Sequence, residues 1–584
     1  MDKSQEKKNI VKYLTILWNS FIPKKRIHLF LILILMVLTT FLEIITISSL
    51  LPFLKVITNQ DFSYDPHLQK FLITFNLSYD KKTLLVFFSI LFVALNLLSG
   101  FLKILFLWLS TKISYSLGSD ISLKLYKNVL YKPFSYHLKT NSSQVITNIS
   151  QKAYSIPYNI ILPTLQLISS VFAVTLILLT LLIINFYVSV VIFSGFTLIY
   201  FFVVFLFNNK LKVYSKNLSE ESSNIVRFLQ EGLGSIRDII LNSQQKIYSQ
   251  IFEKSDKILK SSLGKVAFIT QSPKYFVETL SMILIASIAF FYTFNTPNSY
   301  NVVPILGVFA LAIQRLLPYC QQIYGSYTTI MASKEILYDV TILLEETTNI
   351  NDSFRQNTRK IKFDKEIVLS NIKFGYHPNK YILKNININI KKGDRIGIIG
   401  SSGSGKSTLL NILMGLIYPT SGTLVVDNKN ITLRNVQYWR RNIAHVPQSV
   451  FIIDDSLAQN IALGVPKDQI NFKKCINALS GANLDNLLIE LENGLNTNLG
   501  ERGARLSGGQ IQRIGIARAL YKENNIIIFD EPTSSLDDDT EDSIIKHIET
   551  LDKNLTIIIA THKKNTLKFC NKVFNISKNE IINQ

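Results

Sequence analysis

Long apolar runs, separated by polar and basic segments, dominate the first 345 residues of this sequence. A helix of roughly 20 apolar residues is long enough to cross a bilayer core of about 30 Å. The runs are apolar on all sides rather than along one stripe, which excludes the buried helices of a soluble protein. The pattern therefore predicts six membrane-spanning helices, at residues 28–54, 84–109, two within 153–209, 276–294 and 302–327.

The charges between these runs predict their orientation. Segments 110–158 and 209–275 are long and rich in lysine, whereas 185–187 and 295–301 are short and uncharged. Because cytoplasmic loops carry the excess of Lys and Arg, the long segments and the N-terminus are predicted to be cytosolic. The N-terminus lacks a small-residue cleavage site, so we expect it to be retained. Both long segments have few helix breakers, so the spans are expected to continue as helices into the cytosol.

Composition agrees with a membrane part joined to a soluble part. The chain of 584 residues is 48% hydrophobic with a net charge of +21. Its basic residues are scattered and many flank the apolar runs, which argues against nucleic acid as a partner. Cys320, Cys475 and Cys570 lie far apart in the sequence, which predicts neither a disulfide framework nor a zinc site.

Beyond a polar linker at residues 346–365 the pattern changes. Short β-rich runs alternate with helical stretches, which predicts an α/β domain over residues 366–584 with a largely parallel sheet. The expected strands are 367–369, 395–399, 423–426, 526–530 and 556–560.

The strand at 395–399 opens into a glycine-rich loop followed by a helix, which is the setting of a P-loop. Backbone N–H groups of such a loop face phosphates, Lys406 reaches the β and γ phosphates, and the Ser407 hydroxyl is offered to Mg²⁺. The predicted ATP-binding residues are Gly400, Ser401, Ser402, Gly403, Ser404, Gly405, Lys406, Ser407 and Thr408.

Two acidic residues end the apolar strand at 526–530. Asp530 is predicted to be a metal ligand, and Glu531 is predicted to orient or polarise the attacking water. ATP and Mg²⁺ are therefore the expected cofactors.

Residues Ser507, Gly508, Gly509 and Gln510 form a glycine-rich turn that opens a helix, a second anion-binding helix N-terminus. This segment resembles the signature of ABC ATPases, in which the motif of one subunit closes over the γ-phosphate held by the other. The resemblance implies further roles. It makes Tyr376 the adenine-stacking aromatic, Gln448 a γ-phosphate sensor and metal ligand, Asp537 part of the D-loop, and His562 a catalytic switch.

The whole chain resembles an ABC exporter half-transporter, with a six-helix all-α transmembrane domain over residues 1–345 and an α/β P-loop ATPase domain. The family implies a homodimer through both domains. It also implies short coupling helices between the domains, and the candidates are residues 134–137 and 231–238.

Charged residues inside the predicted spans suggest the cargo, because they are costly there and face an interior or an aqueous cavity. Lys103, Lys274 and Arg315 are candidate substrate-binding residues for an anionic group. The alternatives are that Lys274 snorkels to the interface and that Arg315 pairs structurally with Glu43 or Glu278.

Residues 67–77 are amphipathic, as a helix lying on the outer surface would be. Together with segments 41–48 and 312–318 they resemble the bacterial flippases of lipid-linked oligosaccharides. That resemblance implies a lipid-linked anionic substrate, a polyprenyl-diphosphate oligosaccharide, in the bacterial inner membrane with the ATPase domain in the cytosol. A multidrug or lipid A type exporter is the alternative, favoured by a cavity lined with aromatic residues rather than cations.

Overall fold

In a computed structural model the chain divides into two compact units. The first contains described residues up to 345 except 133–138, and the second contains 133–138 and the described residues from 360 onward. The structure describes residues 10–57, 81–184, 186–295, 302–345, 360–377, 380–532, 541–542, 545–546, 549, 552–562, 567–577 and 580–583.

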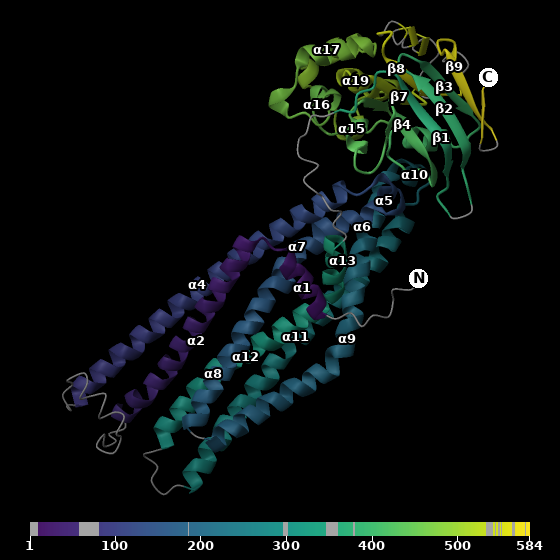
Figure 1. The fold of residues 1–584 in the computed structure, drawn as a ribbon. Helices are drawn as coiled ribbons and strands as arrows, with labels where there is room; N and C mark the ends of the chain where they lie inside the picture. The colour runs from purple at the N-terminus through teal and green to yellow at the C-terminus, as the bar shows by residue number, and fades with distance from the viewer. Residues whose placement is uncertain are drawn as a thin grey trace. The chain divides into compact units, whose positions relative to one another are not determined.

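Within these residues the first unit is built on six long helices that run alongside one another (Figure 1). They are α2 (Pro23–Ile57), α4 (Lys81–Leu130), α8 (Leu162–Ile184), α9 (Phe186–Gly234), α11 (Gln245–Asn295) and α12 (Val302–Ala332). Shorter elements are α1 (Ile10–Ser20), α6 (Ser142–Thr147), η2 (Asn148–Lys152), α7 (Ala153–Ile156), η3 (Pro157–Ile161), α10 (Ile236–Leu241) and α13 (Lys334–Glu345).

The six long helices cover the six predicted spans. Of the described helices, four stretches are long and apolar enough to cross a membrane by length and composition alone: Pro23–Leu54, Lys82–Leu130, Ser142–Ile183 and Phe193–Gly234. The predicted fifth and sixth spans lie in α11 and α12. Helix α4 has 50 residues, about 75 Å, so it continues far beyond a bilayer core, as predicted for the cytosolic extensions.

Close helix packing holds together the end of this unit at which α6, η2, α7 and η3 lie. The helix from α6 to α8 contains two π-helical turns, and Pro157 begins the second of them. A methyl group added at Gly118 of α4 would lie 2.2 Å from the Pro157 side chain, so only glycine allows this approach. Leu117, Ile121 and Ile156 are fully buried in the surrounding cluster.

The second unit contains two sheets (Figure 1). The larger has the strand order β10-β9-β3-β8-β7-β6, parallel except for the edge strand β10. Its strands are β3 (Arg395–Gly400), β6 (Ile443–Val446), β7 (Ile526–Asp530), β8 (Thr556–Ala560), β9 (Lys572–Ser577) and β10 (Glu580–Asn583).

A separate antiparallel sheet was not predicted from the sequence. It has the order β2-β1-β4-β5 and takes two of the predicted strands away from the parallel sheet. Its strands are β1 (Glu366–Phe374), β2 (Leu383–Lys391), β4 (Ser421–Val426) and β5 (Lys429–Asn430). The physical sign is burial: β2 alternates between buried and exposed residues, whereas β7 and β8 are buried almost throughout.

Helices cover these sheets, and one of the helices packed against them is a short helix from the first half of the chain. Phe134 of α5 (Phe134–Lys139), a predicted coupling segment, packs against the core of the second unit. The other predicted coupling segment, 231–238, spans the end of α9 and the start of α10. The remaining elements are α14 (Lys406–Leu413), α15 (Val436–Arg440), α16 (Leu457–Ile461), η6 (Lys467–Gln469), α17 (Phe472–Gly481), α18 (Asp485–Glu490), η7 (Gly494–Asn496), η8 (Glu501–Gly503) and α19 (Gly508–Tyr521).

Candidate functional site

The predicted P-loop lies between the end of β3 and the start of α14. Gly405 caps α14 with a φ of 104°, a left-handed conformation that favours glycine. A Cβ there would lie 2.9 Å from Ile382 and 3.0 Å from Leu383, so a side chain would not fit. The loop therefore curls back over the helix N-terminus, which leaves its amides placed for an anion.

Lys406 is buried inside this curl. Its Nζ donates to the carbonyl oxygens of Gly400 at 2.9 Å and Ser401 at 3.3 Å. It also lies 2.8 Å from His562 Nε2 and 3.9 Å from Glu531 Oε1. Burial lowers the pKa of Lys406, against the opposing effect of the carboxylates of Glu531 and Asp530. The carboxylates that stabilise this ammonium group thus come from the end of β7.

The three residues predicted to act in catalysis lie together: Gln448 and His562 both contact Glu531. Gln448 Nε2 donates to Glu531 Oε2 at 2.9 Å, and His562 Nε2 lies 3.0 Å from Glu531 Oε1. Glu531 has a φ of 50° and its amide donates to the Ala560 carbonyl, so the chain turns sharply directly after β7. A protonated His562 Nε2 donates to Glu531, whereas an unprotonated one accepts from Lys406. One nitrogen cannot do both, so the tautomer of the His562 ring selects its partner.

Asp530 and Ser407 form the predicted metal pair. Ser407 Oγ donates to Asp530 Oδ1 at 3.3 Å. Burial raises the pKa of Asp530, with the Ser407 hydrogen bond opposing and the Glu531 charge adding to the effect. A hydroxyl and a half-buried carboxylate within one hydrogen bond are the oxygen donors that Mg²⁺ prefers, so the residues fit a Mg²⁺ ion.

The remaining loop residues fit a phosphate site in part. Ser404 Oγ is buried and has no hydrogen-bond partner among the described residues, as a group awaiting a ligand would be. Tyr376 is 39% exposed and packs edge-on against Phe374, with ring centroids 5.0 Å apart. Ser401, Ser402, Gly403 and Thr408 lie in or directly after the same loop.

The signature segment begins α19 and is ordered by its own cap. Ser507 Oγ accepts from the Gln510 amide at 3.2 Å, and Gln510 Oε1 accepts from the Ser507 amide at 2.8 Å. No atom of the described residues lies within 4 Å of a Cβ built at Gly508, so this helix N-terminus is open. Predicted Asp537 lies outside the described residues, as does the outer amphipathic segment 67–77.

In the membrane unit, two of the three predicted substrate residues converge on Glu43, which is 1% exposed. Lys103 Nζ lies 2.6 Å and Arg315 Nη1 lies 3.8 Å from Glu43 Oε1. Tyr319 donates a hydrogen bond to Glu43 Oε2, and Arg315 Nη2 donates to Asn96 Oδ1 at 3.0 Å. Two cations share one carboxylate, so this cluster carries a net charge of +1.

Lys274 is not part of that cluster: it lies exposed on α11, and no described ion pair or hydrogen bond joins it to Glu43. Sequence reasoning missed Asn96 and Tyr319. Tyr319 follows Arg315 by four residues and so lies on the same helix face, which is the signal that would have found it. Asn96 precedes Lys103 by seven residues, about two turns of α4, and so carries the same signal.

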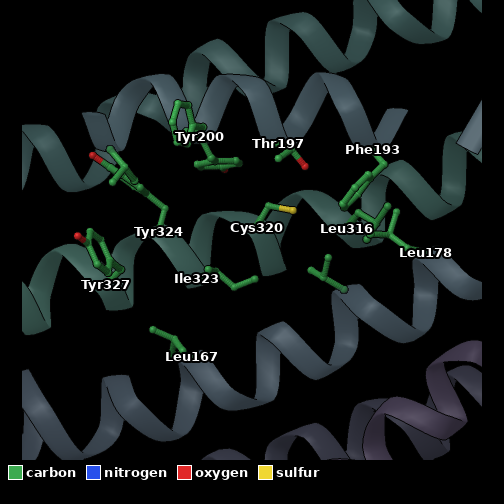
Figure 2. A pocket seen from close by; sticks show the side chains of 13 residues that line it. Leu167, Leu178, Phe193, Thr197, Tyr200, Leu316, Cys320, Ile323, Tyr324 and Tyr327 are labelled. Carbon is green, nitrogen blue, oxygen red and sulfur yellow. The ribbon is translucent and has the colours of Figure 1, made fainter. Parts of the chain in front are cut away.

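A cavity of about 480 Å³ lies between α8, α9 and α12 of the same unit. Figure 2 shows Tyr200, Tyr324 and Tyr327 at one end and Phe193, Leu178 and Leu316 at the other. None of its described lining residues is charged. Arg315 is next to Leu316 in sequence but is not among the lining residues, so the predicted cations do not line this cavity.

Comparisons with known proteins agree with this two-part architecture. A model of the ABC transporter transmembrane region matches residues 29–316, and a model of the ABC transporter matches residues 383–534. A solved structure, of a bacterial Atm1-family ABC exporter with ATP bound, superposes with a TM-score of 0.77 at 18% identity. It covers 95% of both chains and shows the exporter fold.

The curated relatives of this chain include toxin transporters and a lipid flippase. The leukotoxin translocation ATP-binding protein LktB of Mannheimia glucosida is 40% identical over 220 residues, 38% of this chain and 31% of that protein. The ATP-dependent lipid A-core flippase of Francisella tularensis subsp. holarctica is 27% identical over 376 residues, 63% of this chain and 60% of that protein. This chain spans about a third of the length of the first relatives it matches.

Proposed function

This chain belongs to the ABC transporters, with a helical transmembrane region followed by an ATP-binding domain, and we propose that it is the half-transporter of an ATP-driven lipid exporter. The observation that supports ATP hydrolysis best is the meeting of Lys406, Gln448 and His562 at Glu531. The observation that supports a lipid is the uncharged aromatic cavity between α8, α9 and α12.

The chemistry proposed for the second unit follows from these positions. The Gly405 turn presents backbone amides to the phosphates of ATP, and Lys406 exchanges its carbonyl partners for phosphate oxygens. Ser407 and Asp530 would hold Mg²⁺, which when bound neutralises charge developing on the phosphates. Glu531 orients the attacking water, with Gln448 and His562 holding its two carboxylate oxygens in place.

Two copies are part of the proposal. The open N-terminus of α19 at Ser507 has no phosphate of its own, so it would close over ATP bound by another copy. Co-expression of a Lys406→Ala copy with a Ser507→Ala copy tests this. Heterodimers should retain at most one intact composite site, and full two-site activity from a strictly monomeric preparation would contradict the arrangement.

The cargo is proposed at two levels of detail. An amphipathic lipid suits the apolar cavity together with the net positive cluster of Lys103, Arg315 and Glu43. A relative named for flipping lipid A-core supports this level. The narrower candidate is a polyprenyl-diphosphate oligosaccharide, whose diphosphate would contact Arg315 and Lys103. Lys274 lies apart and would act only at the cytosolic approach. The proposed location is a bacterial inner membrane with the ATPase unit in the cytosol.

ATPase stimulation separates these cargoes. Purified protein in liposomes is given an acylated glycolipid such as lipid A, a polyprenyl-diphosphate sugar, or a hydrophobic drug, each over the same concentration range. We expect the acylated lipid to raise hydrolysis. Stimulation by the polyprenyl compound alone would select the narrower candidate, and stimulation by drugs alone would contradict lipid export.

A further inference from the structure

The cavity between α8, α9 and α12 has one polar end. Tyr200 of α9 and Tyr324 of α12 come from different helices, and their ring centroids are 5.8 Å apart (Figure 2). The opposite end, at Phe193, Leu178 and Leu316, is purely apolar. The cavity volume of about 480 Å³ is in the range of sites that enclose small ligands, roughly 300–1,000 Å³.

Both tyrosine hydroxyls are buried without a hydrogen-bond partner among the residues that the structure describes. Tyr324 itself is only 4% exposed. A buried hydroxyl without a partner costs free energy, and inside a bilayer no bulk water is available to satisfy it. Two such donors side by side at one end of an apolar cavity therefore point to an acceptor on a ligand.

The depth of this end in the membrane identifies a suitable acceptor. Tyr324 lies 22 residues after the start of α12 at Val302, roughly 33 Å along the helix, and its neighbour Tyr200 lies 14 residues after the start of α9 at Phe186, roughly 21 Å along that helix. Since the short uncharged connections are assigned to the outside, both depths place the tyrosine end in the cytosolic half of a hydrocarbon core of about 30 Å. Phe193 lies only about 10 Å from the outer start of α9. The cavity thus runs from the cytosolic half of the hydrocarbon core toward the outer half.

We propose that this cavity binds the fatty acyl chain of a lipid, with the chain among Phe193, Leu178 and Leu316 and its ester carbonyl accepting hydrogen bonds from Tyr200 and Tyr324. An ester carbonyl is an uncharged hydrogen-bond acceptor at the end of an apolar chain, which suits two uncharged donors at the end of an apolar cavity. A polyprenyl diphosphate has no such carbonyl, and its charged group would require cations, which the described cavity lining lacks. This inference rests on the proposed lipid export and narrows its cargo to acyl-ester lipids.

The test compares two lipids that differ only in the carbonyl. A diester phospholipid and its diether analogue, with identical chains and headgroup, compete for a radiolabelled diester lipid on the full-length protein in detergent. Because each of the two hydrogen bonds contributes about 1 kcal/mol, we expect the diester to bind roughly 30-fold more tightly. Equal binding of the two lipids by the wild type would overturn the proposal.

Phenylalanine variants test whether the preference for the diester lipid comes from the hydroxyl groups of Tyr200 and Tyr324. The double variant Tyr200→Phe with Tyr324→Phe keeps both rings and should lose the diester preference while binding the diether as the wild type does. Tyr187→Phe, an 82% exposed tyrosine at the outer start of α9, is the matched control and should keep the preference. An unchanged preference in the double variant would contradict the assignment. Cys320→Phe, which fills the middle of the cavity, should weaken both lipids equally.

The acyl chain in the cavity could belong to exported cargo or to a resident lipid of the bilayer. Trapping the protein in a nucleotide-bound state distinguishes the two. With Glu531→Gln protein and ATP, release of the diester lipid identifies it as cargo. If the diester lipid stays bound and the diester preference is intact, the tyrosine site is supported. The lipid is then a resident bilayer lipid, which contradicts its assignment as exported cargo. Loss of the preference for the diester over the diether lipid would contradict the tyrosine site, but it would not bear on ATP-driven export.

Discussion

The ATP-binding unit and the membrane unit hold their charged groups in opposite ways. In the former, each functional side chain sits at the end of a strand or the start of a helix, as Lys406 and Asp530 do. In the latter, Glu43, Lys103 and Arg315 come from three different helices and meet only through tertiary packing. Local backbone geometry can be predicted from contiguous residues, whereas convergence of helices cannot. Motifs therefore predict which residues of this chain act in catalysis, whereas they do not predict which residues recognise cargo.

The largest effect is expected at the catalytic carboxylate. Glu531→Gln should lower ATP turnover by about 10²–10⁴-fold, because the amide cannot act as a base toward water, while nucleotide binding persists. Steady-state hydrolysis and equilibrium ATP binding check it. Glu523→Gln, an exposed partner of Lys474, is the control and should hydrolyse normally. Hydrolysis at the wild-type rate by Glu531→Gln would remove the assigned role.

Lys406→Ala should reduce ATP affinity by roughly 10–100-fold, since a hydrogen bond to a charged phosphate contributes about 1.5–3 kcal/mol. Fluorescent nucleotide titration measures this loss. The exposed Lys384→Ala variant should bind as the wild type does. Unchanged affinity in Lys406→Ala would mean that the buried ammonium keeps its carbonyl partners when nucleotide binds.

The membrane cluster makes the next prediction, which concerns stability rather than catalysis. Glu43→Gln leaves two cations facing each other and should lower the free energy of unfolding by about 3 kcal/mol. Arg315→Ala should cost only about 1 kcal/mol, because Lys103 remains paired with Glu43 at 2.6 Å. Thermal unfolding in detergent measures which of the two variants is less stable.

Glu278→Gln is the matched control for that pair, as an exposed carboxylate on α11 with no described ion pair to Arg315. It should unfold like the wild type. If Arg315→Ala were as destabilising as Glu43→Gln, the sharing of one carboxylate by two cations would be wrong. Impaired transport with normal basal ATPase in Arg315→Ala would instead favour its predicted contact with an anionic cargo.

The smallest effect is a pH-dependent one in the water-exposed unit. Asp394 accepts from Lys572 Nζ at 2.6 Å, the Lys391 amide at 2.8 Å and Asn571 at 3.1 Å. Burial alone would raise the pKa of Asp394, but these hydrogen bonds outweigh it and hold the pKa below its ordinary value of 3.8. The stabilisation is therefore present above that value and is lost as pH falls through the folded pKa.

Asp394→Asn should accordingly lower stability by about 1 kcal/mol at neutral pH, and the difference from the wild type should shrink as the solution is acidified below about pH 4. The exposed Glu492→Gln variant controls for surface charge. A difference that stays constant with pH would show that Asp394 acts by packing rather than by its charge.

These regions also differ in how far the sequence predicted them. The P-loop turn, the β7 carboxylates and the α19 N-terminus were predicted from contiguous residues because strand, loop and helix are set locally. The antiparallel sheet was missed because a strand's partners are not visible in its own sequence, and only the pairing of β1 with β2 and β4 distinguishes these strands from parallel ones. The six spans were predicted from the length and order of the apolar runs, and the exporter fold from the resemblance of six spans followed by one ATPase domain to that family.

In the membrane unit the sequence predicted which residues were unusual and offered Glu43 as a partner of Arg315, but it did not predict that Lys103 shares the same carboxylate. Lys103 and Arg315 were singled out as costly charges, yet their common partner and the hydrogen bond from Tyr319 depend on the rotation of α2, α4 and α12. The same applies to Tyr200 and Tyr324, which are ordinary aromatic residues in sequence and neighbours only in the folded unit.

Translocation of a headgroup-labelled, ester-linked glycolipid in proteoliposomes tests ATP-driven lipid export most directly. Protein oriented with its ATPase unit outside should carry the label from the outer to the inner leaflet when ATP is added, where it becomes protected from a membrane-impermeant quencher. Protection should be absent without ATP and in Glu531→Gln. Wild-type protein that hydrolyses ATP at a normal rate in the presence of this lipid without protecting any label would contradict lipid export.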